Sequence, residues 1–262
     1  MKRIVVVSYS KSGATWFRFL VYGAEKGIPS NSVQVNKFYP FDRTRDYIWP
    51  KDRDRVFVKT HSYYRPEVPI IKENDGSILI IRNPFDLIFS WLAHMRLSGL
   101  LLYSHGDLIQ YFKMFETKSK NMDYHYNSWK DKVSIIIKYE DMIQDLDSVL
   151  NKVNKALDLD WSSTDIKNAV ISGNKEKMAQ MEEYEMANKI EGGLFYKPKK
   201  VEAYTNRKER FIGGRRKKED LDVFLNDFKD DFLKFFTPLA DELGYDLNKI
   251  IKNSLDHAKR NC

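Results

Sequence analysis

Cysteine is almost absent from this 262-residue chain, whose one cysteine is Cys262. That scarcity excludes an intramolecular disulfide and a metal site built on cysteines, and it is typical of a reducing compartment. The chain also lacks an apolar run of the ~18 residues that a membrane-spanning helix needs. Its first apolar run, Ile4 to Val7, is too short for a signal peptide. We therefore expect a cytoplasmic protein that makes no contact with a membrane.

Two familiar site signatures are also missing. The ATP-binding spelling G-x-x-x-x-G-K-[ST] does not occur, and the five histidines show no H-E-x-x-H or similar zinc spacing. The sequence therefore predicts no metal site. The chain does have an excess of positive charge: it contains 44 lysines and arginines and 37 acidic residues, which give a net charge of +7. This excess favours an anionic partner, although a solvated basic surface would give the same count.

Four short runs rich in β-branched residues have the pattern of buried strands: Arg3–Val7, Arg55–Lys59, Ser77–Ile81 and Val133–Lys138. They alternate with longer stretches of helical period, an order typical of a parallel sheet with helices on its faces. The sequence therefore predicts an α/β fold. We expect a single domain over residues 1–262, with a P-loop-like, three-layer arrangement of a central parallel sheet flanked by helices.

The helical stretches are predicted to follow the first strand, to start at Asn83-Pro84, and to cover about 141–157 and 218–236. Two other stretches, 31–55 and 188–215, have weak periodicity and are predicted to be long loops. Such loops either cover a site or form plain surface.

The segment after the first strand, Ser10-Lys11-Ser12-Gly13-Ala14-Thr15, has the layout of a phosphate cradle. A glycine lets the backbone approach a ligand closely, and the N–H groups at a helix start attract an anion. Lysine adds a positive charge, the hydroxyl groups add donors, and Trp16 could stack on a base. The alternative is a capped helix after an ordinary turn.

The residues that follow the other strands also carry useful chemistry. Lys59 and His61 follow the second strand, and histidine is the natural general base near neutral pH. Arg82 follows the third strand, where its guanidinium can bind a phosphate. A magnesium-dependent P-loop enzyme would instead need an acidic residue at a strand end to hold the metal. Ser90 lies further along the helix that begins there. Tyr139 follows the fourth strand, either to reach a ligand or to pack.

Together these motifs resemble the cytosolic-type sulfotransferases, which use 3′-phosphoadenosine 5′-phosphosulfate (PAPS). "SYSKSGATW" is similar to that family's Y-P-K-S-G-T-T-W loop, "KTH" to its catalytic histidine segment, "RNPFDLIFS" to its 3′-phosphate motif, and "KYEDM" to its Y-E-D-M segment. All four occur in the family's order. The later "NRKERFIGGRRKK" resembles the family's R-K-G-x-x-G loop with one extra residue. Lys175 stands where the family has an aromatic residue near the adenine, Ser10 replaces a proline and Ala14 a threonine.

The resemblance implies transfer of a sulfuryl group from PAPS, with 3′-phosphoadenosine 5′-phosphate (PAP) as product and no metal. The implied general base is His61, with Lys11 and Lys59 stabilising the developing charge. The implied donor-binding residues are Lys11, Ser12, Gly13, Ala14, Thr15, Trp16, Arg82, Ser90, Tyr139, Arg207, Lys208, Gly213 and Gly214.

The acceptor is expected to be a small molecule, such as a specialised metabolite or a phenol, that offers a hydroxyl or, less favourably, an amine. Segments 38–49, 63–64, 91–95 and 188–205 are expected to bind it. Two alternatives stay open: a P-loop-type nucleotide kinase, and a non-catalytic basic binder of nucleic acid. Acidic residues interspersed along the chain argue against nucleic acid as a partner. The sequence does not indicate an oligomeric state.

Overall fold

The computed structural model describes residues 1–39, 54–97, 104–196, 212 and 217–260. In these parts of the chain, four strands form one sheet: β1 (Lys2–Ser8), β2 (Arg55–Thr60), β3 (Gly76–Ile81) and β4 (Ile135–Lys138). The strand order is β2-β1-β3-β4, and every pair is parallel. The predicted strands and the parallel α/β sheet flanked by helices are thereby confirmed.

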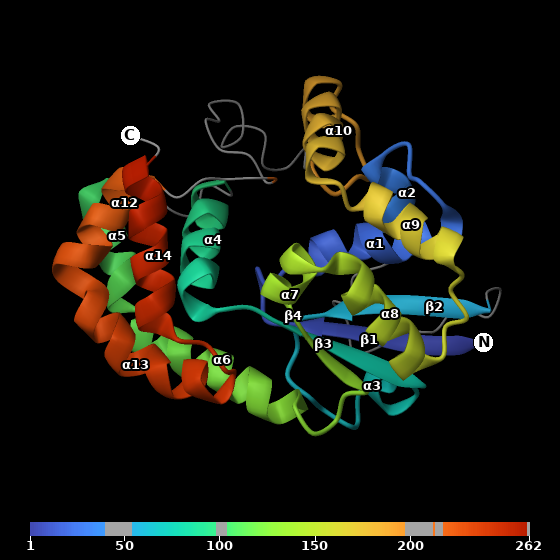
Figure 1. Cartoon of the computed structure of the whole chain (residues 1–262), viewed down its shortest axis with the longest axis horizontal. Coiled ribbons are helices and arrows are strands. Elements are labelled where there is room, and N and C mark those ends of the chain that lie inside the picture. Colours follow the sequence, from blue (N-terminus) through green and yellow to red (C-terminus); the bar gives the residue numbers. More distant parts are fainter. Residues whose placement is uncertain (40–53, 98–103, 197–211, 213–216, 261–262) are drawn as a thin grey trace. The chain divides into compact units, whose positions relative to one another are not determined.

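The described helices alternate with the strands along the chain (Figure 1). They are α1 (Ala14–Lys26), α2 (Ser32–Phe38), α3 (Pro69–Lys72), α4 (Pro84–Leu97), α5 (His105–Lys113), α6 (Phe115–Trp129), α7 (Tyr139–Gln144), α8 (Leu146–Leu157), α9 (Ser163–Ser172), α10 (Lys175–Ala187), α12 (Lys218–Val223), α13 (Lys229–Glu242) and α14 (Leu247–Arg260). No helix among the described residues has the length and apolar character that crossing a membrane requires.

Contacts group the residues into two units. The sheet unit comprises Met1–Ile81 and His125–Val201, and the helical unit comprises Arg82–Tyr124 and Glu202–Cys262. The strands and α1 belong to the sheet unit, whereas α4, α5, α12 and α13 belong to the helical unit. Helix α6 begins in the helical unit, and its last residues, from His125 onward, belong to the sheet unit.

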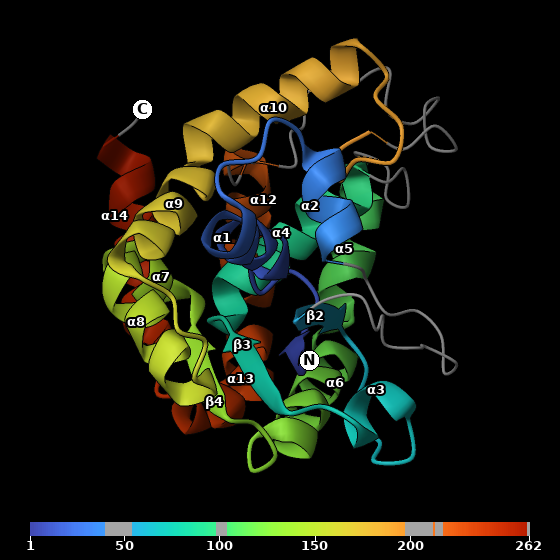
Figure 2. The same ribbon diagram turned by 90° about the vertical axis from the view of Figure 1, so that its right-hand side faces the viewer.

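The core of the sheet unit lies between the sheet and helices α1, α8 and α9. The four residues of β1 from Ile4 to Val7 have no exposed surface, as expected for a central strand of a parallel sheet. Helices α1 and α9 lie side by side in both views (Figures 1 and 2). Gly23 allows this approach, because a Cβ atom there would lie 2.7 Å from the Cα atom of Ala169. The sheet therefore holds α1, and with it the loop before α1, in a fixed place.

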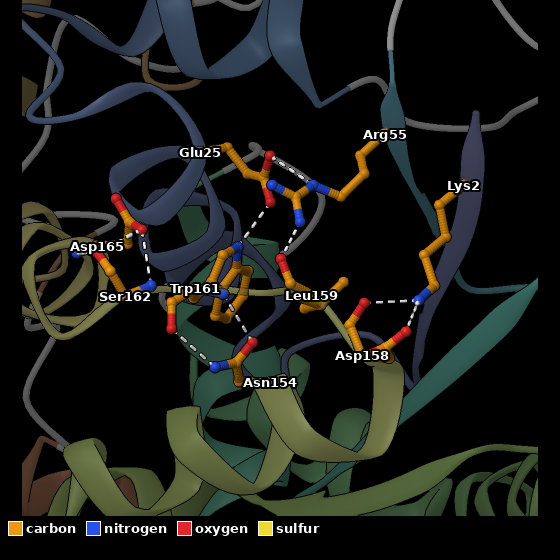
Figure 3. Close-up of polar contacts among 9 residues, drawn as sticks. All are labelled: Lys2, Glu25, Arg55, Asn154, Asp158, Leu159, Trp161, Ser162 and Asp165. Atoms are coloured by element: carbon orange, nitrogen blue, oxygen red, sulfur yellow. Dashed lines mark hydrogen bonds and ion pairs between the residues drawn. The ribbon is translucent and has the colours of Figure 1, made fainter.

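A polar cluster joins the start of β2 to the end of α1 and to the segment before α9 (Figure 3). The Glu25 carboxylate accepts hydrogen bonds from Arg55 Nε at 3.1 Å and from Trp161 Nε1 at 2.6 Å. Arg55 also donates to the carbonyl oxygen of Leu159. Because the Glu25 side chain is mostly buried, these charge-assisted bonds fix the three segments more firmly than a surface ion pair would.

The helical unit is built around phenylalanine. Eight rings pack mainly edge to face, with centroids 4.7–6.5 Å apart: Phe85, Phe89, Phe112, Phe115, Phe224, Phe228, Phe232 and Phe236. A buried bidentate ion pair joins Arg96 of α4 to Asp220 of α12, with N–O distances of 2.5 and 2.7 Å. This pair fixes the end of α4 against α12.

Three predicted elements differ from the structure. The predicted helix at 141–157 is two helices, because Asp145 ends α7 and caps α8 by accepting from the Ser148 N–H. The helix predicted over 218–236 is interrupted by a π-helical turn at Phe224–Phe228. The predicted loop 31–55 contains α2, which Asn31 caps by accepting from the Gln34 N–H. The caps at Asp145 and Asn31 and the wider π-helical turn account for these three differences.

Candidate functional site

The candidate site begins where β1 ends. The loop from Tyr9 to Gly13 turns back on itself, with the Ser12 N–H donating to the carbonyl oxygen of Tyr9 at 3.2 Å. Lys11 has a φ of 76° and Gly13 a φ of 102°, both in the left-handed region. A lysine in that region is strained, and such strain concentrates at binding and catalytic sites.

Gly13 is required by its surroundings as well as by its backbone angle. A Cβ atom at this position would lie 2.4 Å from Cδ2 and 2.9 Å from Cε2 of Tyr139, which begins α7 after β4. Any other residue would push the tyrosine away. The half-buried Tyr139 therefore packs against the loop, and its contact with a ligand stays a prediction.

Helix α1 starts without a side-chain cap, because its N-cap residue is Gly13. The first N–H groups of a helix have no partner within the helix, and the helix dipole places partial positive charge there. The Ser12 hydroxyl beside them is buried and has no hydrogen-bond partner among the described residues. A donor group and an uncapped helix start at one place form a cradle that suits an anion.

Trp16 is held by a distant helix. Its Nε1–H donates to the carbonyl oxygen of Gly173, the C-cap of α9, at 2.8 Å, and its ring meets Tyr139 edge to face at 5.5 Å. The contact fixes one edge of the indole against α9. Stacking of Trp16 on a base therefore stays a prediction.

His61 follows β2 and is bound to the end of β1. Its Nδ1 lies 2.6 Å from the carbonyl oxygen of Ser8 and 3.2 Å from the Ser8 hydroxyl. A carbonyl oxygen can only accept a hydrogen bond, so Nδ1 carries the proton. The neutral ring then has its lone pair on Nε2, which is the tautomer that a general base needs.

The surroundings of His61 oppose a charge on its ring. Burial, the nearby charges of Lys59, His125 and Lys11, and a hydrogen bond to Ser8 act together, and the pKa falls to about 3. Burial and the positive neighbours lower the pKa, whereas the Ser8 carbonyl opposes that change. His61 is therefore neutral at pH 7, with two lysine charges close enough to act on the same ring.

The sequence analysis missed His125, which is also buried beside this site. It lies near the end of α6, is only 2% exposed, and packs against the rings of Tyr9 and Tyr63. Burial lowers its pKa to about 4. The available signal was that His125 and Trp129 are four residues apart on one face of a helical pattern, which is also the pattern of an ordinary core histidine.

The predicted acceptor segments fall partly within the described residues. Phe38 packs against Tyr22, and the buried Tyr39 packs against Phe57 in the core of the sheet unit. Tyr64 meets Trp129 edge to face at 5.0 Å. Residues 40–49 and 197–205 lie outside the described residues, and residues 91–95 belong to α4 of the helical unit.

The structure thus brings together part of the predicted site. Lys11, Lys59, His61, the loop at residues 12–16 and Tyr139 all belong to the sheet unit. Arg82 and Ser90 belong to the helical unit, and the structure does not place them against these residues. Arg207, Lys208, Gly213 and Gly214 lie outside the described residues. Among the residues that are described, no three His, Cys, Asp or Glu side chains form a group able to hold a metal ion.

The start of α4 agrees with its sequence pattern. The Asp86 N–H donates to Asn83 Oδ1 at 2.8 Å, and Asn83 Nδ2 donates to Asp86 Oδ2 at 2.9 Å. This reciprocal cap begins the helix at Pro84, two residues after Arg82. Ser90 lies about two turns further along, with part of its side chain exposed. One oxygen of the Asp86 carboxylate, Oδ2, thus takes part in the helix cap.

Comparison with known protein families gives one match over most of the chain. Residues 1–233 match the model of the sulfotransferase domain. A comparison with curated proteins found no match.

Solved structures share the fold at low sequence identity. A retinol dehydratase in complex with androsterone and the inactive cofactor PAP is 18% identical with a TM-score of 0.61, over 92% of this chain and 81% of that one. Mouse sulfotransferase SULT7A1 complexed with PAP is 18% identical with a TM-score of 0.59, over 97% and 89%. These values establish similarity of fold. With the match at residues 1–233, they confirm the resemblance found in the four motifs: this chain belongs to the sulfotransferase-domain family.

Proposed function

We propose that the protein transfers the sulfuryl group of PAPS to a hydroxyl group of a small-molecule acceptor. The observation that carries this proposal is the state of His61. The Ser8 carbonyl selects the tautomer with its lone pair on Nε2, and Lys11 and Lys59 act on the same ring. A neutral histidine can take the proton of an acceptor, and the anionic donor bound beside Lys11 and Lys59 would offset the positive charges that lower the pKa of the ring.

The loop after β1 fits the 5′-phosphosulfate of the donor. The uncapped start of α1 offers N–H groups, the buried Ser12 hydroxyl offers a further donor, and Gly13 lets the backbone come close. Lys11 adds a full charge to these partial charges. Such a cradle neutralises a phosphosulfate with side chains and backbone dipoles.

The proposed roles follow from this geometry. PAPS supplies the sulfuryl group, and PAP departs as the product. His61 accepts the hydroxyl proton at Nε2 as the acceptor oxygen attacks in line, and Ser8 holds the resulting imidazolium at Nδ1. Lys11 and Lys59 stabilise the negative charge that develops on the oxygens around sulfur.

The 3′-phosphate is assigned to Arg82 and Ser90, with Arg207, Lys208, Gly213 and Gly214 as further proposed donor-binding residues. The support is the cap between Asn83 and Asp86, which starts α4 two residues after Arg82 and puts Ser90 about two turns along. Arginine is suited to this task because its planar guanidinium can bind a phosphate through two parallel hydrogen bonds.

The acceptor is proposed to be a hydroxyl-bearing small molecule. Retinol dehydratase, which shares this fold, was solved once with androsterone and once with retinol, each time with PAP. In this chain, Tyr63 and Tyr64 are the aromatic residues that follow His61 after the end of β2. They are candidates for contact with the acceptor.

The test is a transfer assay with ³⁵S-labelled PAPS and a panel of phenols, aliphatic alcohols and amines, run with and without EDTA. In parallel, PAP and AMP are compared for their effect on the melting temperature. We expect labelled product from at least one hydroxyl acceptor in EDTA, and a larger stabilisation by PAP than by AMP.

The alternatives predict different results. A nucleotide kinase would require Mg²⁺ and would transfer phosphate from ATP. A nucleic-acid binder would bind DNA at physiological salt and gain nothing from PAP. Failure of PAP to stabilise the protein, together with no transfer to any acceptor, would overturn the proposal.

A further inference from the structure

The imidazole of His125 lies in an aromatic setting with one polar atom unsatisfied. Its ring centroid is 5.7 Å from that of Tyr9, edge to face, and 6.0 Å from that of Tyr63, at an interplanar angle of 56°. The side chain is 2% exposed, and its Nε2 atom is buried without a hydrogen-bond partner in the described parts of the chain. Both surrounding rings belong to tyrosines, but neither tyrosine hydroxyl forms a hydrogen bond with Nε2.

The same two strand ends contact both histidines. Ser8, the last residue of β1, binds His61, and the next residue, Tyr9, packs on His125. Tyr63, two residues after His61, packs on His125 as well. The charge of one histidine also disfavours charge on the other. His125 is thus a neighbour of the proposed base that the catalytic roles leave unused.

An unsatisfied polar atom in the interior is costly. Burying an imidazole nitrogen without a partner lowers the ratio of folded to unfolded protein by roughly fivefold to a hundredfold. A bound water or ion, a catalytic role or a ligand can account for such an atom in a folded protein. Beside a candidate base, the ligand to consider first is the acceptor.

We propose that His125 Nε2 forms a hydrogen bond with a second polar group of the acceptor, distinct from the hydroxyl that His61 deprotonates. The proposal rests on the sulfuryl-transfer function proposed above and deepens it. It assigns the acceptor to a chemical class: small molecules with two polar groups, such as diols, catechols, hydroxy ketones or amino alcohols. A neutral imidazole can donate or accept at Nε2 according to its tautomer, so each of these groups is a suitable partner.

The experiment compares His125→Phe and His125→Gln with the wild-type protein. Phenylalanine keeps the shape of the ring and removes its nitrogen atoms, whereas glutamine keeps a polar end. His105→Phe is the matched control, because His105 is exposed at the start of α5. Three quantities are measured: the melting temperature, the dissociation constant of PAP, and KM for matched acceptor pairs. The pairs are phenol and catechol, and cyclohexanol and trans-1,2-cyclohexanediol.

We expect His125→Phe to melt at the same temperature as wild type or higher, because a buried unsatisfied atom is removed. The affinity for PAP should not change. KM for the preferred difunctional probe should rise roughly threefold to tenfold, and KM for its monofunctional partner should stay within twofold. His125→Gln should recover part of the difference, and His105→Phe should match wild type in every measurement.

Four outcomes overturn the proposal. A lower melting temperature with unchanged KM would show that Nε2 is satisfied within the protein itself. An equal rise in KM for both members of a pair would show that the ring only packs. If the wild-type protein preferred the monofunctional probes, or transferred the sulfuryl group to none of the four probes, the assignment of the acceptor to the difunctional class would be rejected. In each of these outcomes, stabilisation by PAP keeps the donor assignment intact, so failure of this inference is distinct from failure of the proposed function.

Discussion

The ring of Tyr139 lies so close to Gly13 that a Cβ atom at Gly13 would stand 2.4 Å from Cδ2 of the tyrosine. The contact joins the residue after β4 to the loop after β1, across β3. The shape of the proposed phosphosulfate cradle therefore depends on a side chain from another strand, and a substitution on either side of the contact should affect donor binding.

Gly13→Ala should weaken PAP binding at least tenfold and destabilise the protein by more than about 2 kcal/mol, since it adds a steric clash to the strain of a positive φ. Gly27→Ala is the matched control, because Gly27 also has a positive φ of 82° but has open space around it. With a ψ of −167° it should lose about 1–3 kcal/mol from backbone strain alone, but it should bind PAP normally. Titration calorimetry and thermal denaturation measure both effects. Equal behaviour of the two variants would contradict the role of Tyr139.

Lys11→Gly should lower both the affinity for PAP and the turnover number, because it removes a charge that acts on bound donor and transition state alike. Glycine is the suitable replacement because it adopts the φ of 76° without strain. Lys189→Gly provides the control, since Lys189 is an exposed lysine with a φ of 51°. Both variants should gain slightly in stability, but only Lys11→Gly should lose donor binding. Unchanged PAP affinity in Lys11→Gly would mean that the loop binds a different ligand.

His61→Ala should lower the transfer rate by roughly 10²–10⁴, the usual effect of losing a general base. PAP affinity should stay within a few-fold, because the imidazole is assigned to the acceptor. His105→Ala, which removes an exposed histidine, should leave both quantities unchanged. The rate is measured with labelled PAPS at saturating acceptor. Near-normal turnover in His61→Ala would reject His61 as the base.

Stability should fall as the pH is lowered from 6.5 to 5. The folded-state pKa of His61 is about 3 and that of His125 about 4, both below the usual value near 6.5. In this window the unfolded chain takes up protons that the folded protein does not, so acid favours unfolding. Each histidine should lower the free energy of unfolding by about 1–2 kcal/mol between pH 6.5 and pH 5. Urea denaturation at several pH values measures the slope, and His125→Phe should reduce it by about half. A slope that the variant leaves unchanged would contradict a depressed pKa at His125.

Arg82→Gln should lose most of the preference for PAP over AMP, two ligands that differ only in the 3′-phosphate. A charge-assisted hydrogen bond contributes ~1.5–3 kcal/mol, so PAP affinity should fall roughly tenfold or more while AMP affinity changes little. Ser90→Ala should show the same selectivity with a smaller loss. Lys11→Gly, in contrast, should weaken both ligands and keep their ratio. If Arg82 only braced the turn before α4, Arg82→Gln would lower stability and leave the ratio as in wild type.

The strands were predictable because each is a short, continuous run rich in β-branched residues, and the central strand β1 is buried on both faces from Ile4 to Val7. The start of α4 was predictable because its cap lies within four consecutive residues, Asn83 to Asp86. Local patterns of this kind need no knowledge of the rest of the fold. The positions of Lys11, Lys59 and His61 followed from the rule that ligands bind at the carboxyl ends of parallel strands.

Other features depend on contacts between distant residues and were not predictable. The helical period over 141–157 continues through Asp145, so the pattern gave no sign that the aspartate would end one helix and cap the next. His125 looked like any core histidine until the fold placed it against Tyr9 and Tyr63. The role of Trp16 was likewise hidden, because its hydrogen-bond partner is a backbone carbonyl far along the chain.

The bond between Trp16 and Gly173 spans 157 positions of sequence. During translation, a nascent chain that already displays all of Lys11 to Trp16 still lacks the end of α9 against which the indole is held. Contacts between such remote positions form late, since a long loop must close before they add stability. Ribosome-bound chains that stop before Gly173 should therefore not bind PAP. Binding should appear only once α9 has emerged from the ribosome and packed against α1.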